Sequence, residues 1–255
     1  MSNVKIIYED NHIIAVVKPA SVLSQGDQTG EVSMYDIVKD YIKETKAQKF
    51  QRNFVLGRAP NLGAMEYKKP GNVFLGLVHR LDKPVSGIML FAKTSKGAAR
   101  LSEQFRNHKI QKTYYAIVAG KPKEQRATLK EKVQKISFFA EAFTEKSDED
   151  LLKEIKEATK TRTAELSYEV VKSNEKYSLL KILPKTGRFH QIRVQMTQMG
   201  HPILGDKKYS KAKMREWKNN NSIALCATGI TFKSATGNKT INLKIDLPKE
   251  WDKFI

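Results

Sequence analysis

Two clusters of reactive side chains stand out in the chain, one around Asp82 and one at residues 185–193. Asp82 follows an arginine by two positions and precedes a turn that contains Pro84 and ends at Gly87. Apolar segments of strand type flank this turn, so Asp82 is expected on a loop held by a rigid scaffold, where catalytic side chains concentrate. A carboxylate in such a place can act as a nucleophile when it is ionised and shielded from water.

The second cluster, residues 185–193, has the sequence KTGRFHQIR, with a glycine at an expected helix start. The N–H groups of a helix N-terminus, together with the guanidinium of Arg188, can hold a phosphate. Arg193 lies further along, about one and a half helical turns away, so it can point inward and pair with a carboxylate. Such an arginine keeps its partner ionised at neutral pH.

Each cluster also has a purely structural interpretation. Asp82 could simply cap the turn that follows it. Arg188 and Arg193 could be surface charges on an ordinary capped helix. The first of these interpretations is weakened by the neighbours of the aspartate, because His79, Arg80 and Asp82 fall together between two buried segments. Ionisable groups gathered in this way are typical of a functional site.

The charge balance favours a polyanionic partner. The 255 residues include 46 Lys and Arg against 27 Asp and Glu, a net charge of +19. Such an excess predicts binding to nucleic acid, because neutralised phosphates release counterions. An anionic membrane surface is the lesser alternative, since no basic amphipathic helix stands out. A contribution to solubility alone is the simplest alternative.

Composition also limits the class of protein. Cys226 is the only cysteine, which excludes an internal disulfide and argues against a Cys-based zinc site. No apolar run approaches the ~20 residues of a membrane span, and the N-terminus lacks the layout of a signal peptide. We therefore expect a cytoplasmic protein without membrane association. The sequence carries no cofactor motif, so neither a cofactor nor a metal is expected.

Short strands and single helices are expected to position these clusters. Strands are predicted at residues 4–8, 13–17, 73–77, 88–92, 112–119, 164–172, 177–183, 223–232 and 240–245. Helices are predicted from apolar spacing at residues 33–43, 95–106 and 187–199. Hairpins and single helices connect the strands without a regular βαβ rhythm, which favours an α+β fold.

A single domain is expected over residues 1–255, with insertions near residues 44–70 and 123–163. The first of these segments is basic and is predicted to be a long loop. The second carries interleaved charges of both signs and little strand character, with a helix near residues 148–159.

The motifs resemble the RluA-type RNA pseudouridine synthases, in that family's order and over nearly the whole chain. The matching motifs are HRLDxxxSG at 79–87, KxYxA at 112–116, TGRxHQIR at 186–193 and GHPIxGD at 200–206. The resemblance implies a pseudouridine synthase fold, with a mixed, mostly antiparallel central sheet and flanking helices and loops around a catalytic cleft. It implies an isomerase that converts uridines of rRNA or tRNA into pseudouridine.

The resemblance also implies roles for individual residues. Asp82 aligns with the catalytic aspartate that attacks the target uridine, Tyr114 with the active-site tyrosine, and Arg193 with the arginine that pairs with the aspartate. Arg80 matches an arginine that fills the space left when the uridine leaves its stack. Attack at sugar C1′ or at base C6 stays open, and elimination to a glycal is the favoured course.

RNA contacts are expected on the catalytic domain itself, at Arg80, Arg188, His190, Gln191, Lys207 and Lys208. Two basic segments, residues 43–69 and 205–218, are further candidates, although each could be an ordinary solvated loop. Tyr209 and Trp217 add aromatic rings for base stacking to the second segment. The family motifs begin at the N-terminus, so no S4-type RNA-binding domain is expected. We expect a monomer without an obligate protein partner.

The main alternative is an RNA-binding or RNA-chaperone protein that keeps the fold without depending on turnover. A hydrolase that uses Ser86 is excluded, because no Gly-x-Ser-x-Gly elbow surrounds this serine.

Overall fold

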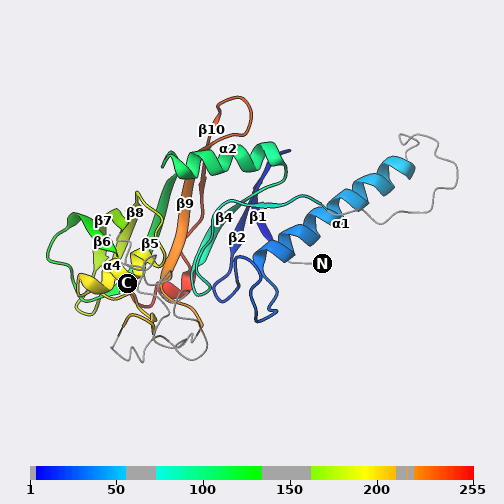
Figure 1. Ribbon diagram of the computed structural model, residues 1–255. Helices are drawn as coiled ribbons and strands as arrows, with labels where there is room; N and C mark the ends of the chain where they lie inside the picture. The colour runs from blue at the N-terminus through cyan, green and yellow to red at the C-terminus, as the bar shows by residue number, and fades with distance from the viewer. Residues whose placement is uncertain (1–3, 56–72, 134–161, 211–216, 218–220) are drawn as a thin grey trace, which may run out of the picture. The chain divides into compact units, whose positions relative to one another are not determined.

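The structure is a computed structural model that describes residues 4–55, 73–133, 162–210, 217 and 221–255 (Figure 1). The chain divides into two compact units, which are described separately. Unit 1 comprises residues 1–110 and 229–245, and unit 2 comprises residues 111–228 and 246–255. That residues 1–255 form a single domain stays a prediction.

Unit 1 has the strand order β1-β2-β4-β9, and β2 pairs antiparallel with both β1 and β4. These strands are β1 (Lys5–Glu9), β2 (Ile13–Lys18), β4 (Ser86–Ala92) and, from Gly229 on, β9 (Leu225–Lys233). The short strand β3 (Gly76–Leu77) pairs with β4, and β10 (Thr240–Lys244) pairs with β9. The register of β2 and β4 sets Lys18 opposite Gly87, at the end of the Asp82 loop.

Two helices complete unit 1, α1 (Met34–Val55) and α2 (Ser95–Arg106). The hydroxyl of Thr94 accepts a hydrogen bond from the N–H of Gly97 and so caps α2. Leu101 of α2 is fully buried in a core cluster with Leu90 and Phe232. Because β2 and β4 are buried over almost their whole length, they form a rigid base for the loop between β3 and β4.

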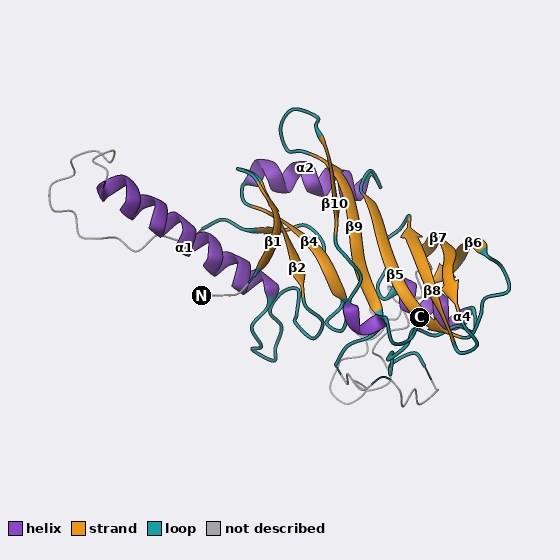
Figure 2. Ribbon diagram, turned by 180° about the vertical axis from the view of Figure 1, so that it is seen from behind, coloured by secondary structure: helices purple, strands orange, loops and turns teal. Residues whose placement is uncertain are grey.

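Unit 2 has the strand order β9-β5-β8-β7-β6, antiparallel from β5 to β6 (Figure 2). Its strands are β5 (Gln111–Ala119), β6 (Arg126–Val133), β7 (Arg162–Ser173) and β8 (Tyr177–Pro184). Helix α4 (Gln191–Gln198) lies on one face of this sheet, where Val194 packs against Ala164 of β7. The short helix η1 (Lys249–Trp251) lies near the end of the chain.

The α+β class is confirmed, as are most of the predicted elements. The helix at residues 95–106 is α2, and the hairpin predicted between residues 164 and 183 is formed by β7 and β8. Local signals were sufficient here because a cap, an apolar stripe or an alternating run marks each element. Within the part of the chain that the structure describes, no helix is both long and apolar enough to cross a bilayer.

The local structure expected of the two predicted insertions needs correction, and their status as insertions stays a prediction. Helix α1 continues to Val55, so residues 44–55 are helical and not part of a loop. This stretch contains Glu, Lys, Gln, Arg and Ala residues, which favour helix even where apolar spacing fades. Strand β6 occupies part of the segment that showed little strand character, and it pairs with β7 over its whole length. The helix expected near residues 148–159 lies outside the described residues.

Candidate active site

The loop that carries Asp82 is a tight turn at the entrance to β4. The carbonyl oxygen of Asp82 accepts a hydrogen bond from the N–H of Val85 at 3.0 Å, which closes the turn over Pro84. Gly87 has a φ of +126°, a conformation that other residues rarely adopt. The predicted turn is therefore confirmed, and it leaves the carboxylate of Asp82 half-buried.

Both chain neighbours of Asp82 are fixed by a second loop that follows β2. The hydroxyl of Ser24 donates to the carbonyl of Leu81 at 2.6 Å and accepts from its N–H at 3.0 Å. The N–H of Ser21 donates to the carbonyl of Lys83 at 2.8 Å. Because the backbone is held on either side of Asp82, the carboxylate is positioned before any substrate arrives.

Lys18 is the buried centre of this support. Its side chain has no exposed surface, and its ammonium donates to the carbonyls of Pro19, Val22 and Lys83 at 2.9, 2.6 and 3.0 Å. Burial lowers the pKa of Lys18 to about 7, and the negative charge of Asp82 acts in the opposite direction. No role for Lys18 was predicted from the sequence, although a lysine before a proline at the end of an apolar strand was the available signal.

The buried ammonium of Lys18 predicts a pH-dependent stability. Its folded pKa of about 7 lies below the ordinary value of 10.5, so the unfolded chain binds more protons between these pH values. The free energy of unfolding should therefore rise with pH. From pH 7 to pH 9 we expect the wild type to gain up to about 2 kcal/mol relative to Lys18→Met.

Urea denaturation of both proteins at the two pH values measures this difference. Lys43→Met is the matched control, because Lys43 is a lysine of α1 whose side chain is 38% exposed; it should follow the wild type at both pH values. Parallel pH profiles for the wild type and Lys18→Met would show that the ammonium does not titrate with folding.

His79 and Arg80 differ in their surroundings. The Nε2 atom of His79 accepts a hydrogen bond from the N–H of Leu90 at 2.9 Å, and its ring stacks on Phe105. This histidine therefore ties the start of the loop to β4 and α2. Arg80 is exposed on the same loop, and its role as an RNA contact stays a prediction.

In unit 2, Arg193 is buried and paired with a carboxylate, as predicted. Its Nε donates to Oδ2 of Asp206 at 2.7 Å and its Nη2 donates to Oδ1 at 2.8 Å. Arg193 is 5% exposed and Asp206 is 2% exposed. Water therefore screens the attraction in this bidentate ion pair only weakly. No role for Asp206 was predicted from the sequence. The pairing of Arg193 with Asp82 stays a prediction.

Asp206 also organises the turn that follows it. Its Oδ1 accepts hydrogen bonds from the backbone N–H groups of Lys208 and Tyr209 at 3.1 and 3.4 Å. The side chains of Lys207 and Lys208 are exposed. One carboxylate thus holds both the guanidinium of Arg193 and the start of the basic segment.

The structure contradicts the base-stacking role expected of Trp217. The indole is 9% exposed and packs against Phe254, while its Nε1–H donates to the carbonyl of Ser222 at 2.8 Å. A Cβ at Gly205 would lie 2.5 Å from this ring. The buried ring of Trp217 therefore packs against Gly205. The sequence did not predict this burial, because the neighbours of Trp217 in the chain are polar.

Tyr114 lies on the same sheet face as α4. It stands opposite Ile182 of β8, which stands opposite Tyr168 of β7. Side chains alternate along a strand, so these residues share a face with Ala164, which packs against Val194 of α4. The structure thus brings half-buried Tyr114 to the face covered by the helix that carries Arg193.

The side chain of Gln191 holds the turn before α4 through hydrogen bonds. Its Oε1 accepts from the hydroxyl of Thr186 at 2.7 Å and from the N–H of Arg188 at 3.0 Å, and its Nε2 donates to the carbonyl of Glu165. Gln191 is buried, which contradicts its expected direct contact with RNA. Arg188 is half-buried, and its Nε donates to the carbonyl of Thr163.

His190 ends this turn in a left-handed conformation, with a φ of +49°. The helix was predicted to begin at Gly187, but it begins at Gln191. The Nδ1 atom of His190 lies 2.8 Å from the hydroxyl of Tyr209, and the ring of Tyr209 lies 5.1 Å from the guanidinium carbon of Arg193. His190 is thus coupled to the Arg193–Asp206 pair through Tyr209.

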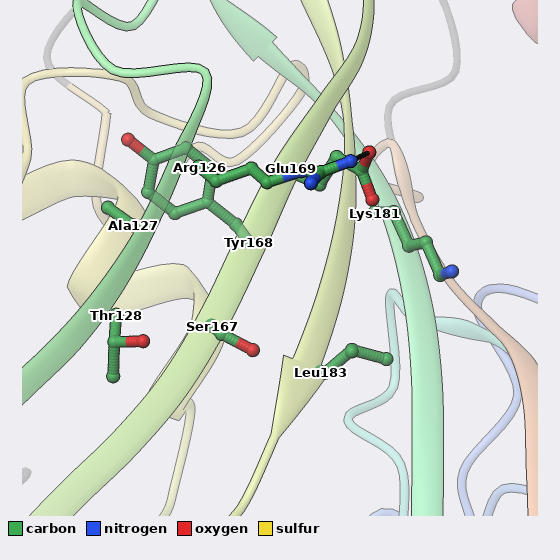
Figure 3. A pocket seen from close by; sticks show the side chains of 8 residues that line it. All are labelled: Arg126, Ala127, Thr128, Ser167, Tyr168, Glu169, Lys181 and Leu183. Carbon is green, nitrogen blue, oxygen red and sulfur yellow. Dashed lines mark hydrogen bonds and ion pairs between the residues drawn. The ribbon is translucent and has the colours of Figure 1, made fainter.

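A depression lies on β6, β7 and β8, and none of the predicted site residues lines it (Figure 3). It is lined by Arg126, Ala127, Thr128, Ser167, Tyr168, Glu169, Lys181 and Leu183. Its most prominent charges, those of Arg126 and Glu169, already form an ion pair. We therefore do not assign the active site to this depression. No group of His, Cys, Asp or Glu among the described residues is arranged to hold a metal ion.

Comparison with known proteins identifies the chemistry. Residues 12–198 match the family described as RNA pseudouridylate synthase. The chain belongs to this family. It is therefore an RNA pseudouridine synthase, an isomerase, and both the Asp82 loop and the turn before α4 lie within the matched residues.

Relatives of this synthase are named for two classes of RNA. A ribosomal large subunit pseudouridine synthase C of Buchnera aphidicola subsp. Acyrthosiphon pisum (strain APS) is 30% identical over 258 residues, covering 98% of this chain and 69% of the relative. A tRNA pseudouridine synthase C of Haemophilus ducreyi (strain 35000HP / ATCC 700724) is 31% identical over 256 residues, covering 96% and 92%.

Solved structures share the fold of this synthase. The human RNA pseudouridylate synthase domain containing 4 matches with a TM-score of 0.65 and 20% identity, covering 97% of this chain and 90% of that structure. The human domain containing 1 matches with a TM-score of 0.67 and 19% identity, covering 97% and 84%. The predicted pseudouridine synthase fold is confirmed.

Proposed function

We propose that this synthase isomerises specific uridines in ribosomal or transfer RNA, with Asp82 as the nucleophile. The observation that carries the proposal is the support of the Asp82 loop, whose backbone is held on both sides by Ser24 and Ser21. Loops fixed so closely around one carboxylate are typical of preorganised catalytic groups. The names of the relatives support both classes of RNA at nearly equal identity.

The reaction exchanges one bond between base and sugar for another. The N1–C1′ bond of the uridine breaks, the uracil turns, and C5 joins C1′; C5 then loses its proton and N1 gains one, so no net oxidation occurs. Asp82 acts on the target nucleotide at C1′ or C6. In the elimination to a glycal that we favour, C2′ gives its proton to the carboxylate as the N1–C1′ bond breaks, and it takes this proton back when C5 joins C1′. The target base must leave its stack to reach the half-buried carboxylate of Asp82.

The other predicted residues have separate roles in this proposal. Tyr114 packs against the target base and assists proton transfer. Arg193 balances the negative charge of Asp82, and Asp206 holds the guanidinium of Arg193 in one orientation. Arg80 enters the space that the extruded uridine leaves.

The exposed basic side chains supply the remaining contacts. Lys207 and Lys208 lie on the surface beside Tyr209, where each can neutralise an RNA phosphate. Arg188 contributes a planar guanidinium suited to the same task. The alternative of an RNA chaperone that works without turnover draws no support from the comparisons.

Mapping of pseudouridines tests the substrate. In cells that lack the gene, we expect one or a few positions in ribosomal or transfer RNA to lose pseudouridine, detected by carbodiimide modification and primer extension. A wild-type copy should restore these positions and an Asp82→Asn copy should not. An unchanged pseudouridine map in both classes of RNA would contradict the proposed substrates.

A further inference from the structure

Phe189 is an exposed aromatic side chain in the turn before α4. It is 53% exposed. The part of the phenyl ring that stays in water contributes no free energy of burial to the fold. Its ring stacks on His190, with centroids 3.8 Å apart and planes 22° apart. Since the histidine covers one face of the phenyl ring, the exposed surface lies on the other face and along the edges.

The ring beneath Phe189 is held firmly. His190 meets Tyr209 edge-on, with centroids 5.6 Å apart, and its Nδ1 lies 2.8 Å from the hydroxyl of that tyrosine. Tyr209 lies over the guanidinium of Arg193. We call Phe189, His190 and Tyr209 the aromatic shelf. A shelf that is ordered beforehand loses little conformational entropy when a ligand stacks on it.

The surroundings of the shelf are cationic. Arg188 directly precedes Phe189, and Lys207 and Lys208 directly precede Tyr209. Both lysines are exposed, while Arg188 is half-buried. An exposed ring among positive charges suits a ligand that presents a flat base and a phosphate backbone together.

We propose that the outer face of Phe189 stacks a base of single-stranded RNA, a nucleotide that flanks the reacting uridine. This inference rests on the proposed function, because the shelf is coupled to Arg193 through Tyr209. Flanking bases lose their own stacking partner when the target is extruded, so an aromatic face replaces that partner. Phe189 is thus a binding residue that holds the flat face of the neighbouring base.

Binding of short oligonucleotides to the full chain tests the shelf. We expect Phe189→Ala to weaken binding of fluorescent oligoadenylate about tenfold, with an unchanged slope of affinity against salt because the phosphate contacts remain. Phe189→Trp should bind at least as well as the wild type. Phe189→Leu keeps the apolar bulk without an aromatic face, and it should lose affinity as the alanine variant does.

Two controls separate stacking from general effects. Leu183→Ala removes another exposed apolar side chain of unit 2, 44% exposed and on the sheet face that α4 does not cover; it should bind oligoadenylate normally. Heparin, a polyanion without bases, should bind Phe189→Ala as it binds the wild type. In Phe189→Trp, oligoadenylate should quench a tryptophan signal above the background of buried Trp217 and Trp251.

The outcomes are distinct from those of the proposed function. Unchanged oligoadenylate binding by Phe189→Ala, or an equal loss of heparin binding, would overturn the stacking site and leave the role of Asp82 intact. Full binding by Phe189→Leu would show that apolar contact is sufficient, which also contradicts stacking. Retained isomerisation by Asp82→Asn would instead overturn the nucleophile, whatever the shelf binds.

Discussion

Asp82→Asn is expected to abolish pseudouridine formation, with a loss of roughly 10⁴-fold or more in kcat, as for other enzymes that lose their nucleophile. The amide has the same shape as the carboxylate but carries no negative charge, so it cannot attack the target nucleotide. The loop should keep its position, because Ser21, Ser24 and Lys18 hold it through backbone carbonyl and N–H groups.

Release of tritium from RNA labelled at C5 of uridine measures the reaction, and filter binding measures RNA affinity. Asp82→Asn should bind RNA nearly as tightly as the wild type, since the basic surface is unaltered. Asp40→Asn is the matched control, because Asp40 is an exposed aspartate on α1 of the same unit; it should keep full activity. A wild-type rate with Asp82→Asn would refute the proposed mechanism.

Asp206→Asn should have the second largest effect, this time on stability as well as on activity. Removal of one charge leaves the guanidinium of Arg193 buried without its carboxylate, which typically costs about 3–5 kcal/mol. The turn at Lys208 and Tyr209 also loses a charged acceptor. We expect a lower midpoint of unfolding in urea. We also expect kcat to stay low at low temperature, where an enzyme that is only destabilised would be folded and fully active.

A variant without either charge separates the effect of an unpaired charge from that of the lost ion pair. Arg193→Met combined with Asp206→Leu replaces both charges by apolar groups, and it should recover much of the stability lost by Asp206→Asn while remaining inactive. Glu169→Gln is the matched control, since it breaks the exposed pair with Arg126; an exposed pair contributes less than about 1 kcal/mol. Equal stability of Asp206→Asn and Glu169→Gln would contradict the importance of the buried pair.

Local sequence signals predicted the elements well where each element carries its own mark. Helix α2 has Thr94 as its cap and Leu101 on its buried face, and its predicted limits agree with the structure. Helix α1 was predicted too short, because its second half is helical by composition and not by apolar spacing. The turn before α4 was predicted as helix, because the left-handed conformation of His190 has no glycine to mark it.

The sequence by itself determined the family, the turn at Asp82 and the cationic character that suits RNA. These properties depend on residue types and on short spacings, which a chain displays without being folded. Only the tertiary structure decided that Lys18 supports the Asp82 loop, that Asp206 holds Arg193 and that Trp217 is buried. The first contact joins residues 65 positions apart, and burial of a charge depends on packing from distant segments, which no local pattern encodes.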